Sequence, residues 1–390
     1  MISALRHFRK PFRLLSFLGL TALLAACQVG VPGSGPTGPR VSGQTINVAM
    51  LLPYGSASAG DDLVARSLEN AARLALTDVP DIQVNLTVYN TAANASQAAA
   101  VAQQAVSEGA DVILGPLRSD AAAAVGVAVA RSNINVLSFS NNTEIAGGNV
   151  FVLGHTFQNT ATRMMSYSAA QGRNRVLILH ARNLAGEVAR EAVERAAVAN
   201  GATITGRVSY EFSQNGVVAA LPTVMSTVRS TDTNALMMTG DAAGALPLFA
   251  QLLPENGLDT EATRVMGLSR WDVPPQTLEL SGLQGGWFAL PDPSAAAQFN
   301  ARYEAANGTP AHILAAIGYD AMRAVAETAA TQGRLGVAEL TASSGFAGAN
   351  GVFRLRADGT NERAMAVVQV ENNQVAVIDP APRRLGPAGF

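Results

Sequence analysis

The sequence predicts an α/β protein in which parallel β-sheets carry helices on both faces. Short apolar runs typical of buried strands alternate along the chain with amphipathic segments typical of helices. This alternation restarts once, near residue 175, which indicates a second unit of the same kind. The length is enough for about two domains, and 48% hydrophobic residues can supply a large core. Repeated strand–helix–strand units favour parallel sheets covered on both faces.

The first series of elements runs from residue 45 to residue 138. Ser96 is expected to cap its second helix, and Gly109 is expected to end that helix. The first helix has one apolar face, which includes Leu68 and Ala71. The predicted strands cover 46–52, 82–89, 111–114 and 135–138, and the predicted helices cover 63–76, 96–106 and 119–131.

The second series begins at Arg175 and has the same rhythm, until Pro291-Asp292-Pro293 interrupts it. Its predicted strands cover 175–180, 203–210, 235–239 and 264–267, and its predicted helices cover 184–199, 217–228, 243–253, 294–307 and 312–331. The chain then changes character. Residues 351–355 and 365–370 are predicted to be antiparallel strands joined through Asp358-Gly359, 374–378 a third strand, and 380–390 a disordered tail.

The N-terminus has the pattern of an export signal. Arginines and one lysine precede an apolar run at 12–24, which ends in small residues before Cys27, the only cysteine. This arrangement resembles a bacterial lipobox. It implies that residues 1–26 are a signal peptide and that Cys27 becomes a lipidated N-terminus. Two weaker alternatives are a transmembrane helix and a buried structural cysteine. The apolar run at 12–24 is short for a membrane span, which needs about 20 residues.

Residues 27–44 are predicted to be a flexible tether because they are rich in Gly, Pro and Ser. Gly33 to Gly38 formally matches the spacing GxGxxG, but no strand precedes it and Pro36 interrupts it, so we reject a nucleotide site. Gln28 follows the cysteine where an Asp usually means inner-membrane retention. We therefore expect a periplasmic protein anchored to the inner leaflet of the outer membrane.

Composition excludes several functions. A formal net charge of −2 is unsuited to nucleic-acid binding, which needs a basic patch. Lys10 is the only lysine, so the processed protein has none for a Schiff base. We find no nucleophile elbow, P-loop or HExxH motif, and no histidine with a partner at metal-ligand spacing. We therefore predict no enzymatic activity, no cofactor and no metal.

Four segments, in their order and spacing, resemble type I periplasmic binding proteins of the branched-chain amino-acid receptor kind. They are Leu51-Leu52-Pro53, 109–116, Gly318-Tyr319-Asp320-Ala321, and Gly351-Val352-Phe353 before Asp358-Gly359. The resemblance covers nearly all of 45–379 and implies two lobes joined by three crossovers. We expect the crossovers near 153–159, 288–293 and 345–351, lobe one at 45–153 plus 293–344, and lobe two at 160–288 plus 351–379.

A narrower resemblance concerns residues 240–293. Gly240-Asp241, 246–254, Met266-Gly267, Trp271-Asp272, 283–285, Phe288 and Pro291-Asp292-Pro293 look like the penicillin-binding protein activator branch of this fold. That branch consists of lipoproteins that stimulate peptidoglycan synthases. It implies a regulator whose partner is a penicillin-binding protein. The alternative is a solute-binding receptor that delivers amino acids or small peptides to an ABC importer.

Candidate ligand-binding residues in lobe one follow from the rule that ligands bind at the carboxyl ends of strands in open α/β sheets. Ser119 could offer its hydroxyl to a carboxylate at a helix N-terminus, as in amino-acid receptors of this family, or could only cap its helix. The candidates in the loops after these strands are Tyr54, Ser56, Arg118, Ser119, Asn141 and Asn142.

Lobe two adds Arg182, Asp241, Arg270 and Trp271 by the same rule. Asp241 could pair with a ligand ammonium, or could cap the helix that begins near residue 243. Trp271 could line an apolar pocket or be packed in the core. Three arginines near the cleft would favour an anionic or peptide-like ligand, or could lie on the solvated rim. His155, near the first crossover, is interpreted as an ordinary hydrogen-bonded histidine or a hinge residue.

Overall fold

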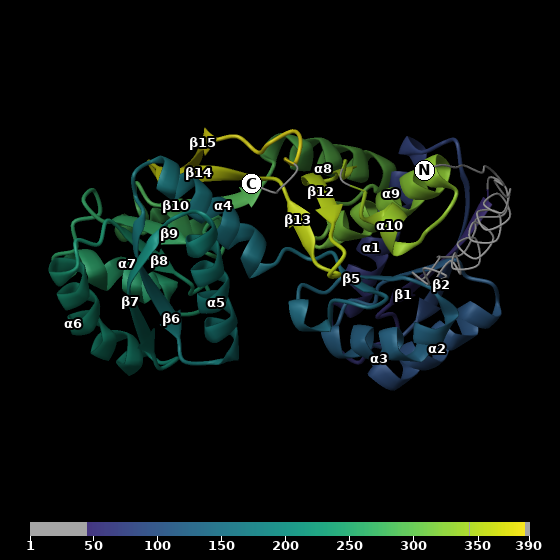
Figure 1. Ribbon diagram of the computed structural model, residues 1–390, viewed down its shortest axis with the longest axis horizontal. Helices are drawn as coiled ribbons and strands as arrows, with labels where there is room; N and C mark the ends of the chain where they lie inside the picture. The colour runs from purple at the N-terminus through teal and green to yellow at the C-terminus, as the bar shows by residue number, and fades with distance from the viewer. Residues whose placement is uncertain (1–44, 343, 387–390) are drawn as a thin grey trace, which may run out of the picture. The chain divides into compact units, whose positions relative to one another are not determined.

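The computed structural model describes residues 45–342 and 344–386. Cys27, the predicted signal peptide and the predicted tether lie outside these residues. The described chain forms two lobes, each built on one mainly parallel sheet, together with a small three-stranded sheet (Figure 1). No helix within the described ranges is both long and apolar enough to cross a bilayer.

Lobe one has a five-stranded parallel sheet in the order β2-β1-β3-β4-β5. Successive residues of β1 point to opposite faces: Val48 and Met50 join the core under α1 and α9, whereas Ala49 and Leu51 join the core under α2 and α3. The elements are β1 (Thr45–Leu52), α1 (Asp61–Ala75), β2 (Gln83–Asn90), α2 (Ala95–Ser107), β3 (Val112–Leu114), α3 (Ser119–Val129), β4 (Val136–Ser138), β5 (Val150–Val152), α8 (Pro293–Asn307), α9 (Ala315–Gln332) and α10 (Val337–Leu340).

Lobe two has a seven-stranded sheet in the order β15-β14-β10-β9-β8-β6-β7, in which only β14 runs antiparallel to the other strands. Helices α4 and α5 cover one face, and α6 and α7 cover the other. The elements are α4 (Phe157–Ala170), β6 (Arg175–Ala181), α5 (Leu184–Ala199), β7 (Thr203–Tyr210), α6 (Gln214–Ser230), β8 (Ala235–Met238), α7 (Leu246–Glu255), β9 (Arg264–Gly267), β10 (Trp287–Pro291), β14 (Met365–Glu371) and β15 (Gln374–Asp379).

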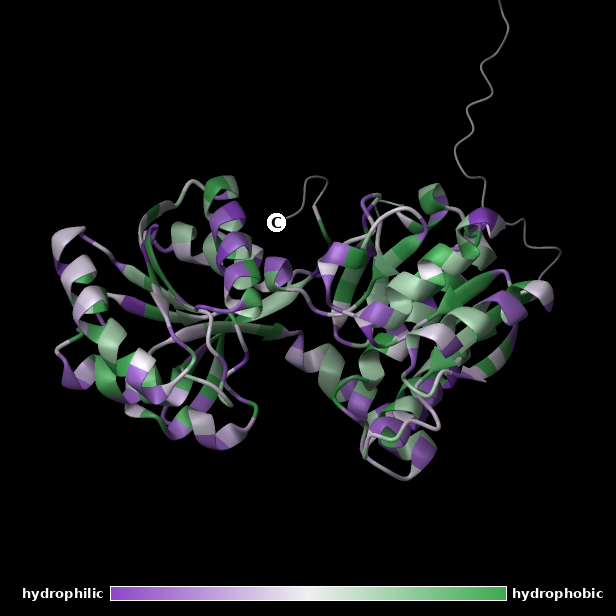
Figure 2. Cartoon of the chain, turned by 90° about the horizontal axis from the view of Figure 1, so that it is seen from below, coloured by the Kyte–Doolittle hydropathy of each residue, from purple (hydrophilic) through white to green (hydrophobic). Residues whose placement is uncertain are grey.

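Several local predictions differ from the structure. Helix α2 is capped by Asn94, whose side chain accepts from the backbone N–H of Gln97, so Ser96 lies inside the helix and does not cap it. Helix α4 was not predicted because its sequence is largely polar. The short strand β5 was also not predicted, and most of β10 was assigned to the second crossover. Hydrophobic residues nevertheless concentrate on the central strands of both lobes (Figure 2).

The small sheet consists of β11 (Phe346–Gly348), β12 (Gly351–Leu355) and β13 (Asn361–Arg363). The predicted pairing of 351–355 with 365–370 is wrong: β12 pairs with β13, and β14 pairs with β10 and β15. Phe353 and Leu355 pack in the core of lobe one. The chain therefore passes from lobe one to lobe two for the last time after Arg363. The third crossover was predicted earlier, near 345–351.

The segments that pass between the lobes are tied together by buried polar groups. Arg363 donates from Nε to the carbonyl of Leu153 at 3.1 Å and from Nη1 to Asp320 at 2.6 Å. Asn361 donates to the carbonyls of Val152 and Gly154, and its own side-chain oxygen accepts from Asn159 of α4 at 2.8 Å. We call these groups (Asn159, Asp320, Asn361 and Arg363) the crossover cluster.

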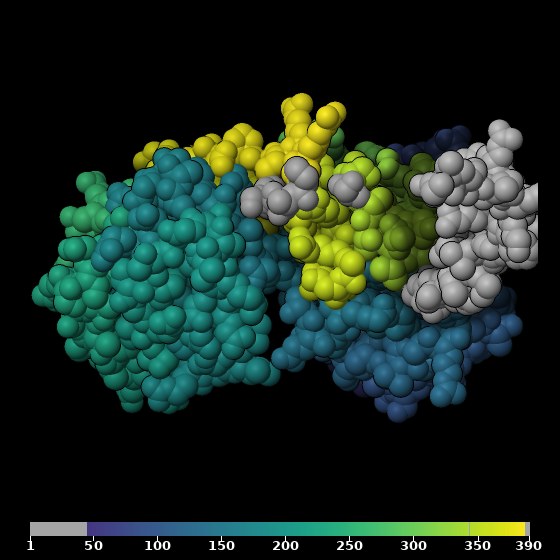
Figure 3. Space-filling model, viewed as in Figure 1, coloured from purple at the N-terminus to yellow at the C-terminus, as the bar shows by residue number. Residues whose placement is uncertain are grey.

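The predicted disordered tail is ordered as far as residue 386. Ala381 is buried, Leu385 packs against the core of lobe two, and Arg354 donates to the carbonyl of Gly386 at 2.9 Å. Arg163 also holds the end of β15 through Asp379 at 2.6 Å. Figure 3 shows this C-terminal segment, in yellow, on the molecular surface. Residues 387–390 lie outside the described part of the chain.

Candidate functional site

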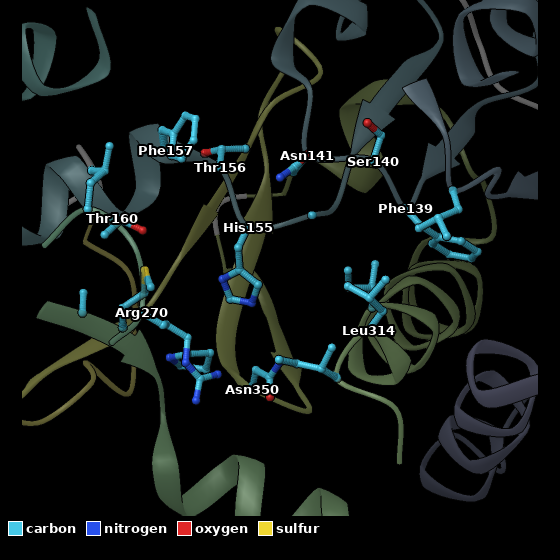
Figure 4. Close-up of a pocket in the computed structure, with 18 residues that line it drawn as sticks. Phe139, Ser140, Asn141, His155, Thr156, Phe157, Thr160, Arg270, Leu314 and Asn350 are labelled. Atoms are coloured by element: carbon cyan, nitrogen blue, oxygen red, sulfur yellow. The ribbon is translucent and has the colours of Figure 1, made fainter. Parts of the chain in front are cut away.

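A cavity of about 490 Å³ lies where both lobes and the segments between them meet (Figure 4). Its wall is mainly apolar, and its polar side chains come from separate loops. It is lined by Leu117, Phe139, Ser140, Asn141, Gly154, His155, Thr156, Phe157, Thr160, Leu268, Arg270, Ala289, Pro291, Ile313, Leu314, Ile317, Asn350 and Met365. A volume of this size suits a small organic molecule.

The topology explains why this cavity forms. Strand β4 ends at Ser138 and strand β9 ends at Gly267, and the residues directly after each strand line the wall. Parallel strands present their carboxyl ends at one edge of a sheet, where their loops converge. The chain first passes between the lobes at residues 153–156, which connect β5 to α4 and which we call the first crossing segment. This segment fits beside the loop after β4 because Gly154 lacks a side chain. A Cβ atom at Gly154 would lie 2.8 Å from the carbonyl oxygen of Ser140.

Arg270 is the charged group of the cavity wall. Asp272 holds its guanidinium with two bonds, from Nε to Oδ1 at 2.9 Å and from Nη2 to Oδ2 at 2.6 Å. Asp272 lines a neighbouring cavity and not this one. The Arg270 side chain stays 37% exposed, so its remaining N–H groups are available to a ligand.

His155 has an unusual environment in the first crossing segment. Both ring nitrogens are buried, and neither has a hydrogen-bond partner among the described residues. The interpretation of an ordinary hydrogen-bonded histidine is therefore wrong. Burial holds the pKa of His155 well below its usual value of 6.5, and the positive charges of Arg363 and Arg270 act in the same direction. The imidazole is thus neutral at neutral pH and offers one donor and one acceptor.

Two of the sequence-predicted site residues, Asn141 and Arg270, line this cavity. Asn142 lies beside a neighbouring cavity, and its side chain accepts from the backbone N–H of Glu144 at 3.0 Å. Trp271 is fully buried in the core of lobe two, with its ring centre 5.3 Å from that of Phe288. Of the two roles weighed for Trp271, the structure shows core packing.

The other lobe-one candidates do not line this cavity. Tyr54 donates to Glu69 at 2.9 Å, and burial together with this bond raises the pKa of Tyr54. Hydrogen bonds from Ser56 and Arg118 lower the pKa of the Asp61 carboxyl, which pairs with Arg118 at 2.9 Å.

Ser119 is the first residue of α3 and makes no capping contact. The cap position is held by Arg118, which has no side-chain capping bond. The predicted capping role of Ser119 is therefore wrong, because the helix begins one residue earlier than that role requires.

In lobe two, Arg182 and Asp241 also lie away from this cavity. Arg182 pairs with Glu211 at 2.7 Å, and both side chains are more than half exposed. Asp241 is exposed after β8, and α7 begins only at Leu246 with Ala245 as its cap. Asp241 therefore does not cap this helix with its side chain, since the helix starts later than predicted.

The sequence analysis missed most of the cavity wall. Leu117 and Ser140 lie in the loops that the same rule nominated but were not selected, and Phe139 directly follows a predicted strand. Ile313, Leu314 and Asn350 lie far along the chain and carry no local signal. Among the described residues, no three His, Cys, Asp or Glu side chains are placed to hold a metal ion.

Comparison with known proteins gives one family and a consistent fold. Residues 45–374 match the family described as periplasmic binding protein. The fold is similar to that of a branched chain amino acid ABC transporter periplasmic ligand-binding protein from Burkholderia xenovorans LB400, with a TM-score of 0.67 and 18% identity over 87% of this chain and 94% of that chain.

Two further solved structures hold ligands. An ABC transporter substrate-binding protein from Desulfitobacterium hafniense in complex with Leu has a TM-score of 0.60 and 20% identity, covering 86% of this chain and 100% of that chain. An ABC transporter solute binding protein from Rhodopseudomonas palustris BisB5 in complex with 3,4-dihydroxybenzoic acid has a TM-score of 0.57 and 19% identity, covering 87% and 97%. At these identities the likeness concerns the fold alone.

Proposed function

Since this chain belongs to the periplasmic binding protein family, we propose that it binds a small solute in the cavity around His155 and Arg270 and delivers it to an ABC importer. The observation that carries this proposal is the cavity itself. It combines an apolar wall with a few polar groups from separate loops, which is the usual composition of a small-molecule site. No reaction is part of the proposal.

The proposed mechanism uses the two-lobed architecture. Residues of both lobes line the cavity, so a ligand that contacts both lobes stabilises their closed arrangement. Domain closure of this kind rests on a few segments that connect the lobes. The transporter then recognises the closed form. Structures of this fold hold solutes as different as Leu and 3,4-dihydroxybenzoic acid, so the fold does not name the solute.

The activator hypothesis, which the sequence analysis favoured, has weaker support. Its motif residues Gly267 and Trp271 have a packing explanation: a Cβ atom on Gly267 would lie 2.3 Å from the indole nitrogen of Trp271. Trp271 in turn packs on Phe288, another residue of the motif. These residues therefore form one packed unit inside lobe two, and this explains them without a peptidoglycan synthase.

We further propose that the protein works in the periplasm and is held to a membrane by lipid on Cys27. This rests on the lipobox-like sequence and on the family. Mass spectrometry of the membrane-extracted protein tests it. A Cys27 peptide carrying acyl groups supports the anchor, whereas an intact peptide spanning residues 1–27 contradicts it.

The binding proposal is tested by thermal unfolding with a panel of amino acids, short peptides, organic acids and muropeptides. A ligand at about 1,000 times its dissociation constant adds roughly 4 kcal/mol of stability, which raises the Tm by several degrees. Ile313→Trp is the blocking variant, because Ile313 lines the cavity and is 61% exposed, so a larger side chain takes up space there without replacing a core residue.

Val127→Trp is the matched control, because Val127 is 81% exposed on α3 and is not among the lining residues. We expect one compound class to raise the Tm of the wild type and of Val127→Trp but not that of Ile313→Trp. A shift that survives in Ile313→Trp places the site elsewhere. No shift with any compound, together with binding of a purified penicillin-binding protein, favours the regulator.

A further inference from the structure

The charges around the cavity indicate the class of solute. Seven of the eighteen lining residues are polar, and none of them is Asp or Glu. The one formally charged lining side chain is Arg270. Asp272, the nearest carboxylate partner, has both oxygens engaged by that guanidinium. The wall therefore offers N–H donors to a ligand and no carboxylate acceptor.

An ammonium group finds no counter-charge in such a wall. A buried ammonium needs a carboxylate or several acceptors, because desolvation of an unpaired charge is costly. Arg270 adds repulsion between like charges. Asp241, the residue predicted to receive an ammonium, is exposed and does not line this cavity.

His155 is the second observation that points to the ligand. An imidazole with two buried and unpaired nitrogens is costly, because neither its donor nor its acceptor is satisfied. The charged groups near it are Arg270, paired with Asp272, and Arg363, paired with Asp320 at 2.6 Å. Each guanidinium already has a carboxylate, whereas the imidazole between them has none.

We propose that the cavity binds an apolar organic acid through its single carboxylate and selects against compounds that also carry an ammonium group. This inference rests on the proposed function. The Arg270 guanidinium, the His155 imidazole and the Asn141 amide hold the carboxylate, and the apolar wall takes an aliphatic or aromatic body. His155 lines this cavity, and neither of its ring nitrogens has a partner within the described chain.

The test compares three compounds that share one body: 3-phenylpropanoate, phenylalanine and 3-phenylpropanamide. Titration calorimetry at pH 7 measures the Kd of each for the purified protein. We expect the acid to bind, and the amide to bind about 10- to 100-fold more weakly because charge-assisted hydrogen bonds are lost. Phenylalanine is expected to bind at least about tenfold more weakly than the acid, because the wall offers its ammonium no carboxylate and places Arg270 beside it.

Variants assign the effect to the named residues. Arg270→Gln is expected to weaken binding of the acid about 10- to 100-fold and to change binding of the amide little. Arg182→Gln is the matched control, because Arg182 also pairs with one carboxylate after a strand of the same sheet but does not line the cavity. His155→Phe keeps the ring shape and removes both nitrogens, and the Tm of each variant shows whether it folds.

The possible failures are distinguishable. If phenylalanine binds as tightly as the acid, or if Arg270→Gln behaves like Arg182→Gln, this inference is wrong. If only other solutes raise the Tm and Ile313→Trp abolishes that shift, the proposed function stands and this inference is still wrong. If no solute raises the Tm at all, both fail together.

Discussion

The crossover cluster and the cavity wall lie next to each other, yet they differ in whether their buried polar groups have hydrogen-bond partners. In the crossover cluster, Arg363 donates hydrogen bonds to the Asp320 carboxylate and to the carbonyl of Leu153. Asn361 donates to the carbonyl of Val152. One residue beyond Gly154 of the first crossing segment, His155 has no partner for either nitrogen within the described chain. Polar groups that hold the lobes are satisfied internally, whereas a polar group that faces the cavity is not.

This difference teaches where stability and function separate. Burying a polar group without a partner costs free energy, so a fold retains one only where something else compensates for it. The crossover cluster should therefore respond to mutation through stability. The cavity wall should respond through binding and through pH. Four predictions test this separation, from the largest expected effect to the smallest.

Arg363→Met should cause the largest loss of stability. Arg363 and Asp320 are almost fully buried, so removing the guanidinium leaves an uncompensated carboxylate. Breaking one partner of a buried pair costs about 3–5 kcal/mol. Urea unfolding followed by circular dichroism measures the loss. A loss below about 1 kcal/mol would mean that the Arg363–Asp320 pair contributes little to the free energy of unfolding.

Asn361→Ala should have an intermediate effect. The variant leaves the carbonyls of Val152 and Gly154 and the side-chain amide of Asn159 without their partner. Unsatisfied buried groups cost about 1–3 kcal/mol. The same unfolding experiment measures this loss. The control is Asn85→Ala, which makes the same substitution at an exposed position of β2, where Asn85 donates to Asn47. Equal losses in the two variants would contradict a special role for the crossover cluster.

His155→Phe should change the pH dependence of stability more than stability at neutral pH. The pKa of His155 lies well below 6.5 in the folded protein and near 6.5 in the unfolded chain. The unfolded state therefore binds more protons in this window, so the wild type loses stability as the pH falls through 6.5. The variant lacks this loss and gains on the wild type by up to about 1.4 kcal/mol per pH unit.

Urea unfolding of both proteins at pH 7.5, 6.5 and 5.5 measures this difference. The pKa of His180 is also lowered by burial, but that residue is present in both proteins and cancels in the comparison. Parallel curves for the variant and the wild type would show that His155 keeps an ordinary pKa.

Arg118→Met should have the smallest effect. Its ion pair with Asp61 at 2.9 Å has a similar geometry to the buried pair, but the Arg118 side chain is 45% exposed. Exposed pairs contribute about 0–1 kcal/mol, so we expect a change near the limit of measurement. Comparison with Arg363→Met isolates the effect of burial, and a loss of similar size in both would mean that burial is not the cause.

The regular elements could be predicted because their signals are local. The range 184–199 predicted for α5 coincides with the helix, and the range 203–210 predicted for β7 coincides with the strand, since hydrophobic periodicity and flanking turn residues fix both. The family resemblance supplied the two-lobed arrangement. Helix α4 was not predicted because its sequence has no clear apolar stripe. Several of its buried residues are polar, and its apolar residues pack in the core of lobe two.

The cavity and the crossover cluster could not be predicted in the same way. Asn159 meets Asn361, and Leu153 meets Arg363, across more than 200 residues of sequence. The loop rule found Asn141 and Arg270 because both follow strands directly. It also nominated Arg118 and Arg182, whose charges are used in ion pairs elsewhere. All three guanidinium groups form ion pairs, so sequence position alone does not tell which of them lines the cavity.

The composition of the lobe-one core has a consequence for how the chain is made. This core joins Ile46 and Leu68, near the beginning of the described chain, with Met322 and Phe353, almost 300 residues later. During synthesis the apolar face of β1 and α1 is complete long before α9 and β12 exist to cover it. Nascent chains in this state expose hydrophobic surface and aggregate unless they are shielded. The first elements of lobe one are synthesised before lobe two, but lobe one can be completed only after the parallel strands of lobe two have been made.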